Sequence, residues 1–234
     1  MTEIVTNNTL DPRSTRASVI ARLQPWFTEA RALLSLGLPL IATQLAHMAM
    51  PTTDILMLGV LGQEALAAAA LATTAYVFLW LIGLGPASAV APVIAQIVGA
   101  NPSDRARVRV ALRMGFWSVL MLCVPIGIGL FFAEEALLAL GQAPELARLA
   151  GPYVQVLSLG LPFSFGFNVL RNFSTALGRP RPPLAIMCAG VLLNIVLDYA
   201  LIFGRFGMPE MGMIGAAFST ALVTAFCFSR WRAL

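Results

Sequence analysis

The sequence predicts an all-α integral membrane protein with six transmembrane helices. Of its 234 residues, 59% are hydrophobic and only 11% are charged, which is far from the composition of a soluble domain. Apolar runs of about 20 residues, the length that crosses a hydrocarbon layer of about 30 Å, recur along the whole chain. We expect these runs to be helices, because a helix satisfies its own backbone polar groups in lipid. No stretch is left over for a separate soluble domain.

The fifteen basic residues are all Arg, and their distribution predicts the orientation of the chain. Thirteen of them precede the first apolar run or adjoin the second, fourth and sixth runs at the same predicted side, and only Arg148 and Arg205 lie elsewhere. Because basic residues are retained on the cytoplasmic side of a membrane, both termini are expected in the cytoplasm and the spans in the cell inner membrane. The same placement accounts for the net charge of +4 without a nucleic-acid partner.

Residues 1–31 are expected to form a cytoplasmic or interfacial segment. They are polar and lack the short apolar core and the small-residue cleavage site of a signal peptide. On a helix, one side of this segment would collect apolar residues and lie in the membrane interface. These residues are Val19, Leu23, Trp26, Phe27 and Ala30.

The first predicted span, residues 32–58, has a polar face. Its polar or helix-distorting residues follow one another at intervals of 3, 4 and 3, which places them on one side of a helix: Gln44, His47, Pro51 and Asp54. This face is expected to look into the helix bundle. The single His of the chain, His47, fits either a proton relay or a helix–helix hydrogen bond.

Five further spans complete a predicted six-helix lobe over residues 32–229, at about 65–98, 111–132, 152–170, 184–203 and 213–228. Residues 230–234 close the chain on the cytoplasmic side. The three Cys residues fall inside apolar runs, which argues against a disulfide framework or a thiolate metal site. The run Phe163, Phe165 and Phe167 could line an internal cavity, but alternate positions on a helix do not share a face, so lipid contact is expected for most of them.

Two acids lie at membrane depth, Asp54 and Asp198. An ionised carboxylate near the middle of a span costs about 2.5–3.5 kcal/mol on insertion scales, so it needs a partner or a proton. No Lys is present and no Arg lies at that depth, which favours binding of H⁺ or Na⁺ over a structural ion pair. Asn194 precedes Asp198 by one helical turn, and it suits either this site or an interhelical hydrogen bond.

The order of these features resembles the N-terminal half of the multidrug and toxic compound extrusion (MATE) family, in its bacterial efflux branch. The resemblance covers residues 33–224. It rests on the motifs TDILMLGVLGQEALAAAA, APVIAQIVGA and LLNIVLDYALIFGRFGMPEMGMIGAAFST, which follow one another in the family's order and spacing.

The resemblance implies an antiporter that expels organic, often cationic, compounds in exchange for H⁺ or Na⁺, and no enzyme or cofactor. A cation site, with Na⁺ as one candidate, would lie at Asp54, Asn194 and Asp198. Its surroundings would include Thr220, Tyr153 and Pro39. Some members carry an amide in place of Asp198 or of His47, so the coupling ion stays open.

Members of the family are about twice as long as this chain and contain two six-helix lobes. We therefore expect the chain to be a truncated product that lacks the C-terminal lobe or, as an alternative, to pair with a second copy. Two other functions stay open, an inactive fragment and an exporter of another amphiphile such as a lipid-linked precursor. An intramembrane enzyme is disfavoured because the sequence holds neither HExxH nor GxSxG.

Overall fold

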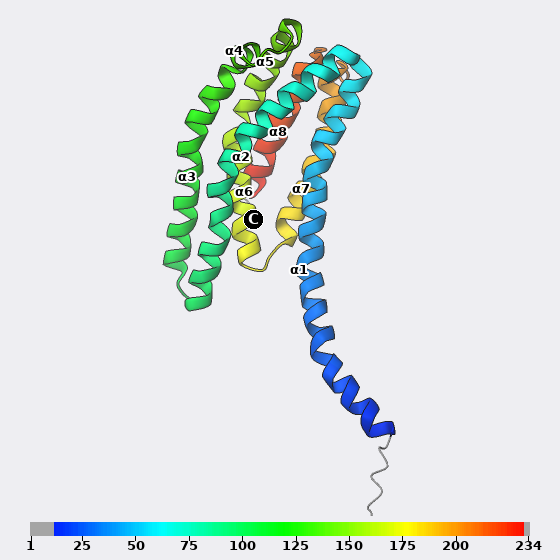
Figure 1. Cartoon of the computed structure of the whole chain (residues 1–234), viewed down its shortest axis with the longest axis vertical. Coiled ribbons are helices and arrows are strands. Elements are labelled where there is room, and N and C mark those ends of the chain that lie inside the picture. Colours follow the sequence, from blue (N-terminus) through cyan, green and yellow to red (C-terminus); the bar gives the residue numbers. More distant parts are fainter. Residues whose placement is uncertain (1–11, 232–234) are drawn as a thin grey trace, which may run out of the picture.

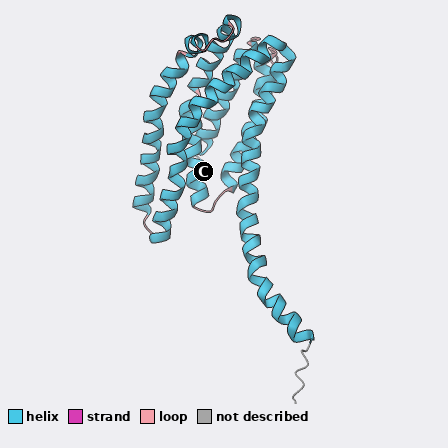
Figure 2. Ribbon diagram, in the orientation of Figure 1, coloured by secondary structure: helices cyan, strands magenta, loops and turns pink. Residues whose placement is uncertain are grey.

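The computed structural model describes the backbone of residues 12–231 and the side chains of residues 29–231. Within this range the chain is helical, with only turns and short connections between helices (Figure 2). The elements are α1 (Pro12–Leu61), α2 (Gln63–Ala100), α3 (Arg105–Phe131), α4 (Ala133–Ala139), α5 (Pro144–Leu159), α6 (Leu161–Ala176), α7 (Arg181–Ile202) and α8 (Gly212–Trp231). The all-α prediction is confirmed. Of the predicted amphipathic face, all but Ala30 lies outside the described side chains.

Five helices are long and apolar enough to cross a membrane: α1 over Glu29–Leu61, α2, α3, α7 and α8. α5 and α6 pass the same test only as a pair, which is bent by 48°, so the candidate crossings number five, or six if this pair is one broken span. The protein is therefore a multi-pass membrane protein. The helices form an elongated bundle, with α3 along one edge and α1 with α7 along the opposite edge (Figure 1).

The span predicted at residues 152–170 falls on two helices, α5 and α6, with a break between them that the apolar pattern does not reveal. Gly160 separates the two helices, and Pro162 lies in the first turn of α6. Pro has no backbone N–H to continue the hydrogen-bond ladder of the preceding turn, so the sequence Gly-Leu-Pro favours a new helix start at this point. A Cβ atom at Gly160 would lie only 3.2 Å from the Cα atom of Ala221, so the break packs closely against α8.

The assignment of the three Phe residues to lipid contact is wrong for two of them. Phe165 is fully buried and Phe167 is nearly so, whereas Phe163 is 38% exposed. Phe165 fits against a gap in α2, because a Cβ atom at Gly83 would come within 2.0 Å of its ring. The small residue on α2 makes room for the aromatic ring on α6, a pairing that alternation along α6 alone does not reveal.

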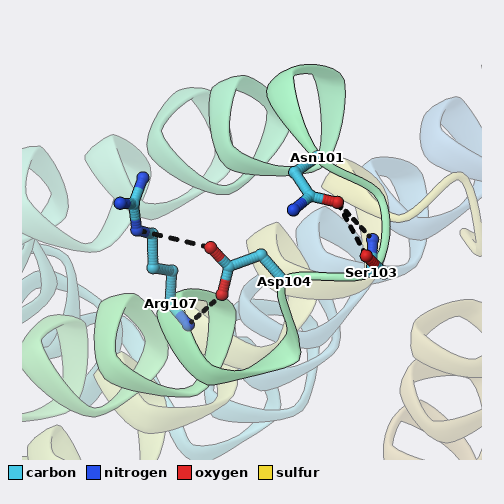
Figure 3. Close-up of polar contacts among 4 residues, drawn as sticks. All are labelled: Asn101, Ser103, Asp104 and Arg107. Carbon is cyan, nitrogen blue, oxygen red and sulfur yellow. Dashed lines mark hydrogen bonds and ion pairs between the residues drawn. The ribbon is translucent and has the colours of Figure 1, made fainter.

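The turn between α2 and α3 is fixed by its own polar side chains (Figure 3). The Asn101 Oδ1 atom accepts hydrogen bonds from the backbone N–H and the hydroxyl group of Ser103, at 3.1 and 2.7 Å. The Asp104 carboxylate accepts from the backbone N–H of Arg107 at 3.0 Å and caps α3. Its second oxygen lies 3.3 Å from the Arg107 guanidinium, the one ion pair found among residues 29–231.

Candidate cation site and adjoining cavity

The acid of the first span faces the bundle interior and is tied to the last helix. Asp54 on α1 is only 6% exposed. Its Oδ2 atom accepts a hydrogen bond from the hydroxyl group of Thr220 on α8, at 3.0 Å. Thr220 and Asp54 are 166 residues apart in the sequence, so this bond joins the first and the last helix of the bundle.

The second acid lies on α7, beside the first. Asp198 and Asn194 are both fully buried, and the carboxyl group of Asp198 neighbours that of Asp54. Three helices therefore bring the predicted cation-site residues together. Asn194 and Asp198 point the same way from α7, as expected for residues one helical turn apart.

Glycines allow α7 and α8 to approach closely at this site. A Cβ atom at Gly215 would lie 2.7 Å from the backbone carbonyl oxygen of Leu201, and one at Gly190 would lie 2.6 Å from the Cys227 sulfur. Small residues at such contacts permit the close helix packing that is typical of membrane proteins. The close approach lets side chains of α7 bond directly to side chains of α8.

Ser219 belongs to this cluster and was not predicted from the sequence. It is fully buried, and its hydroxyl oxygen accepts a hydrogen bond from the Asn194 Nδ2 atom at 3.2 Å. The same hydroxyl group donates to the backbone carbonyl of Asn194 at 3.4 Å. The signal available in the sequence was its position directly before Thr220, within the last motif.

Four buried oxygen atoms of the cluster receive no hydrogen bond from any residue that the structure describes. They are Asp54 Oδ1, Asn194 Oδ1 and both carboxylate oxygens of Asp198. Within the described side chains, no Arg lies within 4 Å of either acid. Burying polar atoms without partners is costly, and most of all for charged groups. The cluster is therefore a concentration of acceptors that a proton or a cation with oxygen ligands would satisfy.

A cavity of about 190 Å³ adjoins the cluster. Asp54, Thr220, Tyr153 and His47 lie in its wall, whereas Asn194 and Asp198 lie behind Asp54 and do not line it. Other lining residues went unnoticed in the sequence, chiefly aromatic and small polar ones on α2 and α6: Thr73, Tyr76, Trp80, Ser164 and Asn168. In the sequence they stand among apolar neighbours, so nothing marked them as interior.

Trp80 organises the part of the cavity wall that includes His47. Its indole ring stacks on Phe165 with 6.2 Å between ring centroids, and its Nε1 atom donates to the Ser164 hydroxyl group at 3.2 Å. The His47 ring lies 6.2 Å from the Trp80 ring, tilted by 30°. His47 therefore contacts an aromatic wall and not the two acids.

Two of the predicted residues lie away from Asp54. Pro39 precedes Asp54 by 15 residues, about 22 Å along a helix, and does not line the cavity. Its carbonyl group accepts a hydrogen bond from Thr43 instead, at 2.7 Å. Gln44 also lies outside the cavity wall, where its Oε1 atom accepts a hydrogen bond from Arg171 at 3.3 Å. Gln44 was expected on this side of α1 from helical spacing, which does not fix its depth along the helix, and Pro39 was expected only from the family resemblance.

The family model MatE matches residues 39–200, which contain α2 to α6 and both acids. The chain belongs to the MatE family. This is a family of membrane transporters and not of enzymes, and the resemblance noted in the sequence is confirmed.

Curated relatives of this MatE chain include two bacterial proteins, each named "Probable multidrug resistance protein NorM". The protein from Bradyrhizobium diazoefficiens is 44% identical over 190 residues, covering 81% of this chain and 40% of the relative. The protein from Rhodopseudomonas palustris is 40% identical over 210 residues, covering 89% of this chain and 44% of the relative. The chain thus spans less than half the length of the relatives it matches.

Solved structures of MATE proteins share the fold of this chain over a similar fraction. One of them is described as the outward-facing conformation of a multidrug resistance MATE family transporter. It is 26% identical with a TM-score of 0.75, and the match covers 86% of this chain and 43% of the solved chain. The eukaryotic MATE transporter AtDTX14 has a TM-score of 0.80 at 22% identity, with coverages of 88% and 45%. The second likeness is one of fold alone.

Proposed function

We propose that the chain forms one lobe of a multidrug exporter of the cell inner membrane. The transporter would expel organic, often cationic, compounds in exchange for H⁺ or Na⁺. The observation that carries the proposal is the buried pair of Asp54 and Asp198, with oxygen atoms that no described residue satisfies. The names of the relatives support the drug-export part of the proposal.

The coupling cation binds between Asp54 and Asp198. Thr220 holds the Asp54 carboxyl group by its hydrogen bond, and Asn194 supplies a further unsatisfied oxygen close to the acids. A hard cation such as Na⁺ prefers carboxylate and amide oxygens, and a proton would bridge or neutralise the same pair. Both ions remove the cost of burying two like charges together.

The drug binds in the cavity beside the cation site. Asp54 is shared between the two sites, since its side chain lies in the cavity wall and also faces Asp198. Aromatic rings such as Trp80 suit the flat surfaces and positive charge of organic cations. A bound cation at Asp54 weakens binding of a cationic drug, and by linkage the drug weakens cation binding to the same extent. This mutual exclusion couples export to cation entry.

A second lobe supplies the opposite wall of the drug pathway. The relatives are more than twice as long as the matched region, which supports a C-terminal lobe in this role or, as the alternative, a second copy of the chain. An even number of spans per lobe suits such a parallel arrangement, because each lobe then starts from the same side of the membrane.

The test is ethidium efflux from cells that lack their own drug exporters. The chain is produced alone and together with the unmatched half of the Bradyrhizobium diazoefficiens relative. We expect gradient-driven efflux in at least one arrangement, and its loss in Asp54→Asn and Asp198→Asn at unchanged membrane abundance. The control is Glu145→Gln, the same change at an exposed acid, which should pump normally.

Efflux at the wild-type rate in either Asp→Asn variant would show that the acid does not couple transport. A wild-type chain that exports no drug in either arrangement would refute the proposed function.

A further inference from the structure

The hydrogen bond between Arg171 and Gln44 joins two helices that do not pack closely against each other. Arg171 lies on α6 and Gln44 on α1, and these helices are not among the closely packed pairs of the bundle. The Arg171 Nη1 atom donates to Gln44 Oε1 at 3.3 Å. The bond holds a charged side chain across the gap between α1 and α6, and the cation site does not use it.

The position of this pair follows from the faces of the two helices. Arg171 comes four residues after Phe167 and three after Asn168, both of which line the cavity. Gln44 comes three residues before His47, which lines it from α1. Residues three or four apart share a helical face, so both side chains lie one turn beyond the cavity wall, on the cavity-facing sides of their helices.

The cavity therefore has two ends of opposite charge. Asp54 provides a carboxyl group at one end, and Arg171 provides a guanidinium group near the other. Gln44 and Asp54 are ten residues apart on α1, which corresponds to about 15 Å along the helix. The wall between the two ends is mainly apolar and aromatic, so it screens the charges weakly.

We propose that Arg171, held in place by Gln44, is a specificity-determining residue that selects substrates by the number and placement of their charges. The inference rests on the proposed function, since it concerns the substrate of the same cavity. An organic cation with one positive charge binds with that charge toward Asp54. A second positive charge at its far end is repelled by Arg171, whereas a carboxylate or carbonyl group there is attracted. Arg171 has donors left for such a group, because its described hydrogen bond uses only Nη1.

Matched pairs of dyes test this inference in everted membrane vesicles that contain the transporter, since doubly charged dyes do not enter intact cells. Propidium carries the ring system of ethidium with a second positive charge, and tetramethylrhodamine is the carboxylate form of its cationic methyl ester. For the wild type, we expect the KM of propidium to exceed that of ethidium by about tenfold, the size of a repulsion between partly buried like charges. We also expect tetramethylrhodamine to have a lower KM than the methyl ester.

Arg171→Gln should reduce the propidium-to-ethidium ratio of KM to threefold or less and remove the preference for the carboxylate dye. The kcat for ethidium should stay within twofold of the wild-type value. Arg171→Lys retains the charge and should keep the wild-type ratios, which a purely structural role of the guanidinium would not predict. The control Arg181→Gln removes an exposed Arg from the start of α7 and should change neither ratio.

Equal ratios in the wild type and Arg171→Gln, with ethidium still exported, would overturn this inference and leave the proposed function intact. A shift of all four KM values by the same factor would also overturn it, since that result describes a general effect of the Arg on folding or orientation. Absence of ethidium efflux in the wild type refutes the proposed function itself, and this inference with it.

Discussion

At the scale of single residues, the candidate site depends on hydroxyl groups as much as on acids. The Thr220 hydroxyl group donates a hydrogen bond to Asp54, and the hydroxyl group of its neighbour Ser219 accepts one from Asn194. Consecutive residues of a helix point about 100° apart, so one short stretch of α8 reaches two different helices. The Thr220 bond leads to α1 and the Ser219 bond leads to α7.

Ser219→Ala should destabilise the folded chain by about 1–3 kcal/mol, because it leaves the buried Asn194 Nδ2 atom without its acceptor. The measurement is the thermal unfolding midpoint of the chain in lipid nanodiscs. Ser229→Ala is the control on the same helix, since Ser229 is exposed and bonds only to the Phe226 carbonyl. Equal midpoints for the wild type and Ser219→Ala would show that the Asn194 bond adds nothing to stability.

The residues that sequence reasoning found and those it missed differ in one physical respect. A carboxylate in an apolar run is expensive wherever it points, so Asp54 and Asp198 are conspicuous in the sequence. A hydroxyl group such as that of Ser219 can bond to its own helix when it faces lipid, so its presence says little about burial. Arg171 was assigned to the membrane surface, because basic residues near the end of a span normally lie there. Its hydrogen bond to Gln44 depends on tertiary structure, which the sequence pattern does not show.

At the scale of elements, the packing of α7 on α8 decides whether the site can form. Gly215 is the tightest contact to backbone in this pair, with backbone atoms of Leu201 and Ile202 all within 3.1 Å of a Cβ atom built on it. Backbone cannot move aside as a flexible side chain can. A substituent at this position must therefore push the two helices apart.

Gly215→Ala should lower stability by about 1–3 kcal/mol, the usual cost of overpacking a tight contact. The expected result is a lower unfolding midpoint in nanodiscs and weaker ethidium efflux, since Thr220 and Ser219 move away with α8. Gly127→Ala on α3 is the matched control, because no atom lies within 4 Å of a Cβ atom there. In that open position Ala should be neutral or slightly stabilising, as Ala is the better helix former. A Gly215→Ala chain as stable as Gly127→Ala would contradict the packing argument.

The helices themselves were more predictable than their interruptions. Long apolar runs must be helical in lipid, so the five unbroken candidate crossings follow from composition and length. The break at Gly160 depends on Pro162 and on the nearby surface of α8. The mean hydropathy of a 20-residue run does not respond to a single Pro or to a neighbouring helix, so it does not reveal the break. The short helix α4 lies in the connector after α3. It was not predicted, because the connector has no apolar periodicity that indicates a helix.

At the scale of the whole molecule, Arg residues mark one end of the bundle. The turn between α2 and α3 and the connection between α6 and α7 lie at the same end, opposite α4 (Figure 1). Both connections adjoin Arg-rich stretches, whereas α4 begins with Glu134 and Glu135 in its first turn. The orientation expected from the sequence would place this Arg-rich end in the cytoplasm.

Cysteine labelling of spheroplasts tests that orientation. In a variant with Ala at positions 123, 188 and 227, one exposed residue at each end is changed, Ser103→Cys or Glu210→Cys. A membrane-impermeant maleimide should label Glu210→Cys in intact spheroplasts and Ser103→Cys only after lysis. The reverse pattern would mean that the chain is inserted the other way round, and labelling of both would mean that the number of crossings between them is even.

The angle between α5 and α6 determines where Arg171 lies. Arg171 lies 11 residues beyond Gly160, so α6 acts as an arm of about 16 Å between the joint and the guanidinium group. A rotation of roughly 10° about this joint would carry Arg171 about 3 Å, far enough to break its bond to Gln44. Tyr153 lies on α5, across the joint, and Asp54 and Asp198 lie on α1 and α7, so none of the three belongs to this arm. The bond between Arg171 and Gln44 is thus sensitive to a small change of the angle at Gly160, and the carboxyl pair on α1 and α7 is not.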